Sequence, residues 1–232
     1  MMTEPSISVI VPAFNEAGSL VSTIEHILAA LPEPSRAELI LVNDGSTDET
    51  HSLMQSVAVS CPAKVVVVNR PVNGGLGAAL ASGFDQATGT VLTWIPGDGE
   101  YDLEEVLAGA PLLDDNDIVL IQRTSRGQRG RNLLSSAMYL LIRVLFGFDA
   151  HGYCGIFIVR RDRWNTITIA SRDVFFTLEV AIRARKAGWS SAMHQAEWRP
   201  RREGRSKVFN VGTVIRNVGE LFAFRWRLWR HR

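Results

Sequence analysis

The stretch TWIPGDGEYD, residues Thr93 to Asp102, decides how this chain folds, because it places carboxylates in a glycine-bounded turn directly after an apolar, strand-like run. In an α/β protein the ends of such strands present the groups that bind ligands. Asp98 and Glu100 lie two residues apart, so both can point to the same side of an extended turn. Their hard oxygen atoms suit Mg²⁺ or Mn²⁺ that carries a substrate diphosphate. Taken alone, the turn is equally typical of a solvated acidic loop before a helix.

The residues before this turn alternate short β-branched runs with amphipathic stretches, which predicts βαβ units and a mostly parallel sheet. The expected strands are Ile7 to Val11, Glu38 to Val42, Lys64 to Asn69 and Val91 to Ile95. The expected helices are Leu20 to Leu31, a helix opened by Thr47 or Asp48, and Gly77 to Ala87. Each loop with unusual polar residues follows a strand, so these loops should gather at one edge of the sheet.

The second half of the chain is less regular. Its pattern predicts strands over 117–122 and 155–159, an apolar helix over 133–146, and a helix over 175–187 that ends at Gly188. Neither a repeat nor a convincing linker occurs. We therefore expect one catalytic domain over residues 1–207, followed by a basic amphipathic tail over 208–232.

Composition favours an ordinary globular protein, with 46% hydrophobic and 21% charged residues in 232. Cys61 and Cys154 have neither metal-ligand nor disulfide-framework spacing, which favours a reducing, cytosolic setting. The N-terminus lacks the basic and apolar regions of a secretory signal. The longest apolar run, 133–148, is interrupted by polar residues and is too short to predict a membrane span.

The net charge of +1 conceals a basic C-terminal segment. Residues 199–232 hold ten Lys and Arg against two acids, a surplus of eight, and the rest of the chain carries −7. Apolar residues recur there at helical spacing, and Trp226 and Trp229 alternate with arginines. Such an amphipathic helix favours an anionic partner or a membrane interface. The alternative is a helix that packs on the domain.

Three more polar motifs follow the expected strands. Pro12 to Glu16 forms a rigid turn that can hold Phe14 and Glu16 toward a ligand, or simply ends a strand. Asp44, in Asn43-Asp44-Gly45-Ser46, can accept hydrogen bonds from a ribose or base, or serve a turn and a helix cap. The glycine-rich segment 73–79 loosely matches a phosphate-binding turn. Its place after the third strand argues against a nicotinamide enzyme.

In order and spacing, these four motifs resemble the family 2 glycosyltransferases of the glycosyltransferase A fold. Within that family they are most similar to the dolichyl- and undecaprenyl-phosphate sugar transferases. The resemblance covers roughly residues 6–210. It implies an α/β domain with a Rossmann-like, mostly parallel sheet flanked by helices, here followed by a basic amphipathic C-terminal helix.

The resemblance also implies roles for individual residues. The nucleotide-sugar contacts would be Pro12, Phe14, Glu16, Val42, Asp44, Gly97, Asp98 and Glu100. Asp98, with Glu100, would ligate the Mg²⁺ or Mn²⁺ that bridges the phosphates and neutralises charge on the leaving group. The chain departs from the family pattern at two positions, because Pro96 and Asn43 stand where relatives carry aspartates.

Four basic or polar residues resemble the family's phosphate-binding groups. Arg123 follows a strand, as an arginine does in these transferases, and would be catalytic by pairing with a phosphate; its alternative is a solvated loop. Residues 201–207 resemble the signature Arg-x-x-Gly-x-Ser-Lys, so Arg201 and Lys207 would grip a diphosphate or lipid phosphate, with Ser206 near the acceptor.

Two acids resemble family residues near the acceptor. Asp149 is otherwise a turn residue, and Glu179 is otherwise a charge on a helix surface.

The predicted activity is transfer of a sugar from a nucleotide-diphosphate sugar to a polyprenyl phosphate, with inversion, at the cytoplasmic face of a membrane. The chain would be peripheral there, held by its tail or by a membrane partner protein. One alternative is a family 2 transferase acting on a hydroxyl acceptor in cell-envelope polysaccharide synthesis. Another is a catalytically weak sugar-nucleotide-binding module. No nucleic-acid-binding motif accompanies the basic residues, so no nucleic-acid partner is expected.

Overall fold

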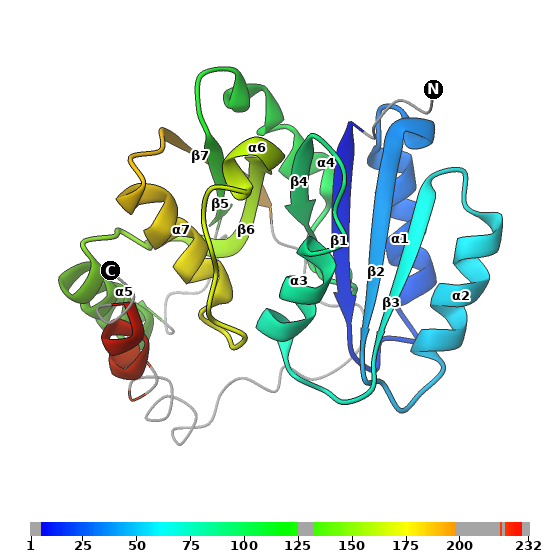
Figure 1. Cartoon of the computed structure of the whole chain (residues 1–232), viewed down its shortest axis with the longest axis horizontal. Helices are drawn as coiled ribbons and strands as arrows, with labels where there is room; N and C mark the ends of the chain where they lie inside the picture. The colour runs from blue at the N-terminus through cyan, green and yellow to red at the C-terminus, as the bar shows by residue number, and fades with distance from the viewer. Residues whose placement is uncertain (1–5, 125–131, 198–218, 220, 229–232) are drawn as a thin grey trace. The chain divides into compact units, whose positions relative to one another are not determined.

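The computed structural model describes residues 6–124, 132–197, 219 and 221–228. The chain forms two compact units, one of residues 1–127 with 152–202 and one of residues 128–151 with 203–232. The first unit holds the whole sheet (Figure 1). The second contains helix α5 (Asn132–Phe146) and the helical residues 221–228. The sequence predicted a boundary at residue 207, with α5 on the catalytic side of it. That boundary stays a prediction.

A seven-stranded sheet organises the first unit, in the order β3-β2-β1-β4-β6-β5-β7. The strands are β1 (Ile7–Ala13), β2 (Ala37–Asp44), β3 (Lys64–Arg70), β4 (Val91–Trp94), β5 (Ile118–Thr124), β6 (Tyr153–Arg160) and β7 (Ser191–Glu197). Strands β1 to β4 pair in parallel, β6 runs antiparallel to both its neighbours, and β7 pairs parallel to β5. The parallel half thus brings the carboxyl ends of four strands to one edge.

Helices cover both faces of the sheet, with α3 and α7 on one side and α1, α2 and α4 on the other (Figure 1). The helices of this unit are α1 (Leu20–Ala30), α2 (Thr50–Ser60), α3 (Leu76–Phe84), α4 (Leu103–Leu107), α6 (Arg161–Trp164) and α7 (Phe176–Lys186). Short 3-10 turns lie at Pro34–Arg36 and Ala110–Asp114. A parallel sheet needs this cover on both faces, because its strands bury both sets of side chains.

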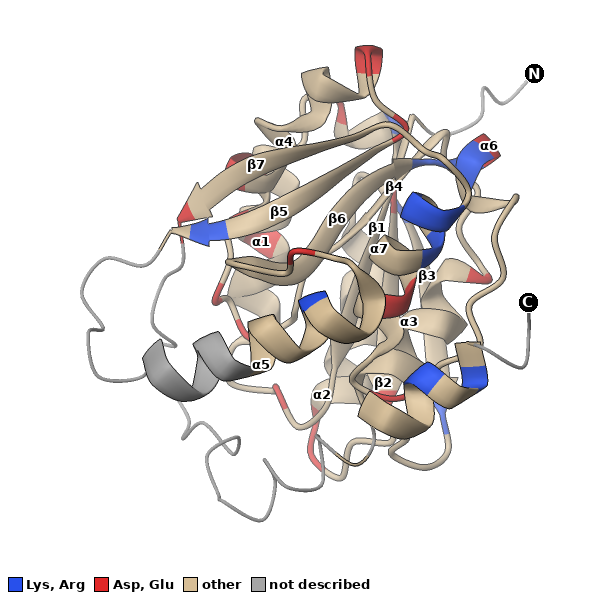
Figure 2. Cartoon of the chain, turned by 90° about the vertical axis from the view of Figure 1, so that its left-hand side faces the viewer, with Lys and Arg blue, Asp and Glu red and all other residues tan. Residues whose placement is uncertain are grey.

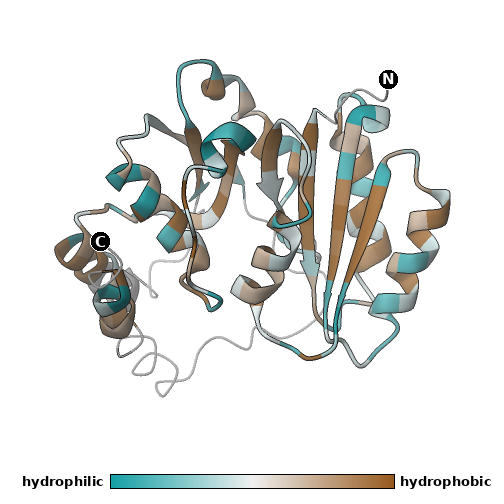
Figure 3. Cartoon of the chain, in the orientation of Figure 1, coloured by the Kyte–Doolittle hydropathy of each residue, from teal (hydrophilic) through white to brown (hydrophobic). Residues whose placement is uncertain are grey.

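The core lies along β1 and β2. Every residue of β2 is buried, as are all but the first residue of β1, and Figure 3 shows these strands as largely hydrophobic. Helix α3 packs directly on them. A Cβ atom on Gly83 would come within 2.4 Å of Ile10 and 3.0 Å of Val42, so the absent side chain permits this close approach.

The predicted α/β fold with a mostly parallel sheet is confirmed, and each predicted strand lies within two residues of its position in the structure. Strand β7 was not predicted, nor were α4 and α6. Of the expected tail helix, the structure describes residues 221–228 as helical, with Leu221, Phe224 and Leu228 buried and Phe222 and Trp226 exposed. Within the part of the chain that is described, no helix is long and apolar enough to cross a membrane.

Candidate active site

The loops after β1 and β2 are hydrogen-bonded to each other. Asn15 donates its amide to Ser46 Oγ at 3.0 Å and accepts the Thr47 amide on its side chain at 2.8 Å. Asn15 adopts a left-handed conformation (φ 55°), which asparagine tolerates better than most residues. The Glu16 amide donates to Thr50 Oγ1 at 2.9 Å. The predicted nucleotide-contacting turn at Pro12 to Glu16 is therefore held by the second motif.

Asp48 adds a further tie between these loops. Its carboxylate accepts the Ala17 amide at 3.2 Å and the Thr50 amide at 3.0 Å. Burial raises the pKa of this carboxyl, but the hydrogen bonds from Thr50 and Ala17 lower the pKa by more. Asp48 therefore acts in the structure as a charged loop brace.

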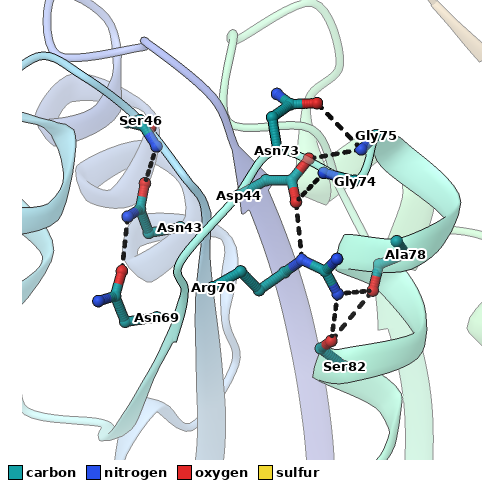
Figure 4. A network of polar contacts seen from close by, with 10 residues as sticks. All are labelled: Asn43, Asp44, Ser46, Asn69, Arg70, Asn73, Gly74, Gly75, Ala78 and Ser82. Carbon is teal, nitrogen blue, oxygen red and sulfur yellow. Dashed lines mark hydrogen bonds and ion pairs between the residues drawn. The ribbon is translucent and has the colours of Figure 1, made fainter.

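Asp44 is the centre of a polar network at the ends of β2 and β3 (Figure 4). The residue is only 3% exposed. Its Oδ1 accepts Arg70 Nε at 2.8 Å and the Gly74 amide at 3.1 Å, and its Oδ2 accepts the Gly75 amide at 2.8 Å. Arg70 was not predicted as a site residue. It stands directly opposite Asp44 in the β2–β3 register.

The glycine-rich turn is shaped to meet Asp44. Gly75 has a φ of +80°, which L residues rarely adopt, and a Cβ on Gly74 would collide with the Arg70 guanidinium. The two amides that this turn presents are those that donate to Asp44. The structure thus favours Asp44, and not a phosphate, as their partner.

The turn that carries Asp98 lies against the end of β1. The Gly97 amide donates to the Pro12 carbonyl at 3.1 Å, and the Gly97 carbonyl accepts Ser19 Oγ at 3.2 Å and Thr23 Oγ1 at 3.3 Å. A Cβ on Gly97 would lie 3.1 Å from Ala13, so the backbone approach is close. The structure therefore brings the predicted metal turn beside the predicted nucleoside turn.

Within this turn, Asp98 Oδ1 accepts the Glu100 amide at 3.0 Å, and Asp102 caps α4 by accepting the Glu104 amide at 3.2 Å. No group of three or more His, Cys, Asp or Glu able to hold a metal occurs in the described ranges. In a nucleotide site, Mg²⁺ usually binds one or two carboxylates together with substrate phosphates and water. The donor set of Asp98 and Glu100 is suited to such a shared ion.

Tyr101, directly after the same turn, lies near Cys154 of β6. The Cys154 thiol donates to the Ile121 carbonyl of β5 at 3.2 Å. Burial is the main cause that raises the pKa of Tyr101, and Cys154 raises it further. Tyr101 is therefore a neutral side chain beside the turn, which sequence reasoning missed.

Arg123 follows Ile121 by two residues at the end of β5. Its amide donates to the Gly152 carbonyl at 2.8 Å. Here β5 and β6 lose regular register between Leu120 and Gln122, and Gly155 in β6 has a φ of +94°. An irregularity of this kind redirects side chains at a sheet edge. The structure thus places Arg123 at the end of β5, two residues beyond the carbonyl that accepts the Cys154 thiol.

Glu179 is buried, so the alternative of a helix-surface charge is wrong. It is 1% exposed, accepts the Ala170 and Ser171 amides at 3.3 and 2.7 Å, and pairs with Arg183 at 2.5 Å. Burial raises the pKa of its carboxyl, but hydrogen bonds from Ser171, Arg183 and Ala170 lower the pKa by more. In the structure this carboxylate holds the loop before α7.

The remaining predicted site residues are placed as follows. Val42 is buried in β2, Phe14 and Glu16 are partly exposed, and Asp149 is an exposed turn residue whose Oδ1 accepts the His151 amide at 3.0 Å. Arg201, Ser206 and Lys207 lie outside the described residues. Their roles stay predictions.

A sheet of this topology, with polar strand ends at one edge and a carboxylate turn after β4, is typical of the α/β proteins that bind a ligand at the carboxyl ends of their strands. The comparison with protein families makes this specific. The family description "Glycosyl transferase family 2" matches residues 8–179, and the chain belongs to this family. The prediction of a nucleotide-sugar glycosyltransferase is thereby confirmed at the level of the family.

Similar proteins include enzymes named for lipid-phosphate acceptors. Polyprenol monophosphomannose synthase of Mycolicibacterium smegmatis is 28% identical over 240 residues, covering 97% of this chain and 89% of its own length. Dolichyl-phosphate beta-glucosyltransferase ALG5A of Trichomonas vaginalis is 26% identical over 214 residues, covering 83% of this chain and 65% of its own. Both matches extend over most of this chain.

Among solved structures, glucosyl-3-phosphoglycerate synthase from Mycobacterium tuberculosis, in complex with Mn²⁺, uridine diphosphate and glucosyl-3-phosphoglycerate, has a similar fold. Its TM-score is 0.70 at 22% identity, with 95% of this chain and 79% of that chain covered. This likeness confirms the predicted glycosyltransferase A architecture.

Proposed function

We propose that the chain transfers a sugar from a nucleotide-diphosphate sugar to a polyprenyl phosphate, with inversion, using Mg²⁺ or Mn²⁺. The observation that carries this proposal is the Asp98 turn, which is hydrogen-bonded to Pro12 at the end of β1. A nucleotide whose nucleoside lies over β1 and β2 would thus present its diphosphate to Asp98. The lipid-phosphate relatives support the choice of acceptor.

The cation would be held by Asp98, with Glu100 as a second oxygen donor, and would supply Lewis-acid neutralisation of the leaving diphosphate. Arg123 would add positive charge on the side of the site formed by β5. Tyr101, next to the Asp98 turn, lies near Cys154, whose thiol donates to Ile121 on the strand that leads to Arg123. These residues orient the donor so that its anomeric carbon faces the acceptor.

A phosphate acceptor is already an anion at neutral pH, so attack on the anomeric carbon needs no general base. It needs cations that hold and align it, and Arg201 and Lys207 are proposed for this task. A hydroxyl acceptor would instead require a carboxylate to take its proton. Glu179 is poorly suited to that, because its oxygens already accept protein hydrogen bonds. Asp149 would then be the candidate base.

The second unit is proposed to meet the cytoplasmic face of a membrane. In residues 221–228, Phe222 and Trp226 are exposed, and the exposed Arg227 places its guanidinium carbon 5.9 Å from the centroid of the buried Phe224 ring. Figure 2 shows the Lys and Arg residues in blue. Aromatic and basic residues together favour an interface with anionic lipids. A membrane partner protein is the alternative occupant of this surface.

The test of the transfer is release of nucleoside diphosphate from UDP- and GDP-sugars by the full chain with Mn²⁺, with and without undecaprenyl or dolichyl phosphate. We expect release that depends on the lipid phosphate, with the sugar recovered on the lipid. If release occurs only when a hydroxyl acceptor is supplied, the acceptor is a hydroxyl and not a polyprenyl phosphate. Binding of nucleotide sugar without any transfer would support the binding-module alternative.

The membrane contact is tested separately by flotation with anionic liposomes. Replacing Phe222 and Trp226 together with Ser should reduce the bound fraction severalfold, because each exposed aromatic side chain buries apolar area at the interface. Replacing the exposed Val59 of α2 with Ser is the matched control. Equal flotation of both variants would remove the second unit as the membrane contact.

A further inference from the structure

We infer that Arg70 is a positioning residue that determines nucleotide specificity, because it fixes Asp44 as a hydrogen-bond acceptor for a base that presents a ring N–H. Uracil and guanine present such a group, whereas cytosine and adenine present an unprotonated ring nitrogen. This inference rests on the proposed function, in which Asp44 faces the nucleoside. Neither the family match nor the named relatives assign a role to Arg70.

Arg70 reaches two elements at once. From β3, its Nε donates to Asp44 on β2, while its NH1 donates to the Ala78 carbonyl at 2.9 Å and to Ser82 Oγ at 2.8 Å on α3. Only a planar guanidinium spans these three acceptors from one position. Its side chain is only 24% exposed, so water has little access to the ion pair with Asp44. Arg70 therefore ties the end of the sheet to the first turns of α3.

The Asp44 carboxylate has one acceptor position left after its contacts with the described residues. Two carboxylate oxygens offer about four lone-pair sites. Oδ1 accepts two hydrogen bonds, from Arg70 and Gly74, and Oδ2 accepts one, from Gly75. The open position is therefore on Oδ2, on a side chain that is 5% exposed.

An ionised carboxylate accepts hydrogen bonds and cannot donate them, so this position distinguishes bases that present a ring N–H donor from bases that present a ring nitrogen acceptor. A ring N–H is attracted to it, and a ring nitrogen with a lone pair is repelled. Hydrogen bonds to charged groups change affinity by roughly ten- to a hundredfold. We therefore expect UDP and GDP to bind at least tenfold more tightly than CDP and ADP.

The experiment measures the Kd of the full chain for these four nucleoside diphosphates with Mn²⁺, by calorimetry below the unfolding temperature. Arg70→Ala and Arg70→Lys are expected to reduce the ratio between the tightest and weakest ligand by about tenfold. Lysine keeps the charge but cannot make the three contacts. Lys64→Ala, which removes the equivalent cation at the other end of β3, is the matched control and should keep the ratio.

A purely structural role for Arg70 would not change this ratio, because a smaller folded fraction weakens every ligand by the same factor. Asp44→Asn gives an independent readout. Its amide oxygen would stay opposite Arg70 and Gly74, so its NH₂ group would occupy the open position. The Gly75 amide would retain its second acceptor, Asn73 Oδ1 at 3.1 Å. The preference should then shift toward CDP and ADP.

The outcomes separate this inference from the function on which it rests. Equal affinities of the wild type for all four ligands, or unchanged ratios in both Arg70 variants, would overturn the inference while sugar transfer remains. Failure of the wild type to bind any nucleoside diphosphate would overturn the proposed function and the inference together. Reduced ratios in the Arg70 variants, with an unchanged ratio in Lys64→Ala, would establish the role.

Discussion

The two ends of the β2–β3 pair are built alike but use their buried carboxylates differently. At the amino end, Glu38 of β2 stands opposite Lys64 of β3; at the carboxyl end, Asp44 stands opposite Arg70. Both acids are buried, at 0% and 3% exposure, and both form an ion pair across the strands. Both also accept backbone amides from the chain that follows β3.

The difference lies in how completely each carboxylate is satisfied. Glu38 Oε1 accepts Lys64 Nζ at 2.6 Å and Thr88 Oγ1 at 2.9 Å, and its Oε2 accepts Ser8 Oγ at 2.6 Å and the Thr88 amide at 2.9 Å. Four hydrogen bonds use its full capacity, whereas Asp44 accepts three. A saturated carboxylate can only hold the fold, and one with a position open can also meet a ligand.

The largest expected effect tests whether chemistry is confined to the carboxyl edge. Asp98→Asn should lower kcat by roughly 10²–10³-fold, since a metal-bound carboxylate supports several kcal/mol of charge stabilisation and about 1.4 kcal/mol corresponds to tenfold in rate. Glu38→Gln should leave kcat per folded molecule unchanged. Initial rates, normalised to the folded fraction, are the measurement.

Chelation of the metal should reproduce the loss in the wild type and add little to that of Asp98→Asn. If Asp98→Asn kept more than a third of the wild-type kcat, Asp98 would not be the metal centre. If Glu38→Gln lost as much as Asp98→Asn, the two edges could not be separated by function.

The next effect concerns stability at the amino edge. Glu38→Gln places an NH₂ group where a carboxylate oxygen accepts protein donors, so at least one buried donor loses its partner. Such a loss costs about 1–3 kcal/mol of the free energy of unfolding. Urea unfolding followed by circular dichroism measures it. A change below about 0.5 kcal/mol would show that Glu38 does not hold this end of the sheet.

Acid should reduce the difference between wild type and Glu38→Gln. Burial raises the pKa of the Glu38 carboxyl, but hydrogen bonds from Lys64, Ser8 and Thr88 lower it by more, so the folded pKa lies below the ordinary value of 4.5. A group whose pKa falls on folding stabilises the protein above its unfolded pKa, and that stabilisation is lost as the pH falls through the folded pKa.

The measurement is the free energy of unfolding of both proteins at pH 7 and at steps below pH 4.5. The gap between them should be constant at the higher pH values and should shrink through the acid range. The pKa values of Asp48 and Glu179 are also lowered, so both proteins lose stability in acid. A gap that does not change with pH would mean that Glu38 contributes by packing and not by its charge.

Much of this fold could be predicted because β1, β2 and most of β4 are buried, and β3, though less buried, carries four consecutive valines, so that the sequence contains continuous apolar runs. Strand β7 was missed because its SAMHQAE sequence has no β-branched residue and, apart from Ala196, its residues are exposed or only partly buried. The order of polar motifs also predicted that the loops after β1, β2 and β4 lie side by side. It did not predict which polar groups pair with each other.

The partner of Asp44 was missed because pairing across strands depends on register, which a propensity pattern does not contain. One signal was present. Glu38 and Asp44 are six residues apart on β2, and Lys64 and Arg70 are six apart on β3. Because the spacing is equal in these neighbouring parallel strands, a register that places Glu38 opposite Lys64 also places Asp44 opposite Arg70. Glu179 was harder to interpret, because its partners at Ala170 and Ser171 lie in a loop without a pattern.

The smallest expected effect compares the two cations directly. Lys64 is 56% exposed on its side chain, so water screens its pair with Glu38, and Lys64→Ala should cost no more than about 1 kcal/mol of unfolding free energy. Added salt should shrink that difference further, because exposed pairs are screened. Arg70 is more buried and also holds α3, so Arg70→Ala should cost more and respond less to salt. Equal costs and equal salt responses in urea unfolding would mean that the two ends of β2 and β3 are interchangeable supports, and the open acceptor on Asp44 would then be the one feature that distinguishes them.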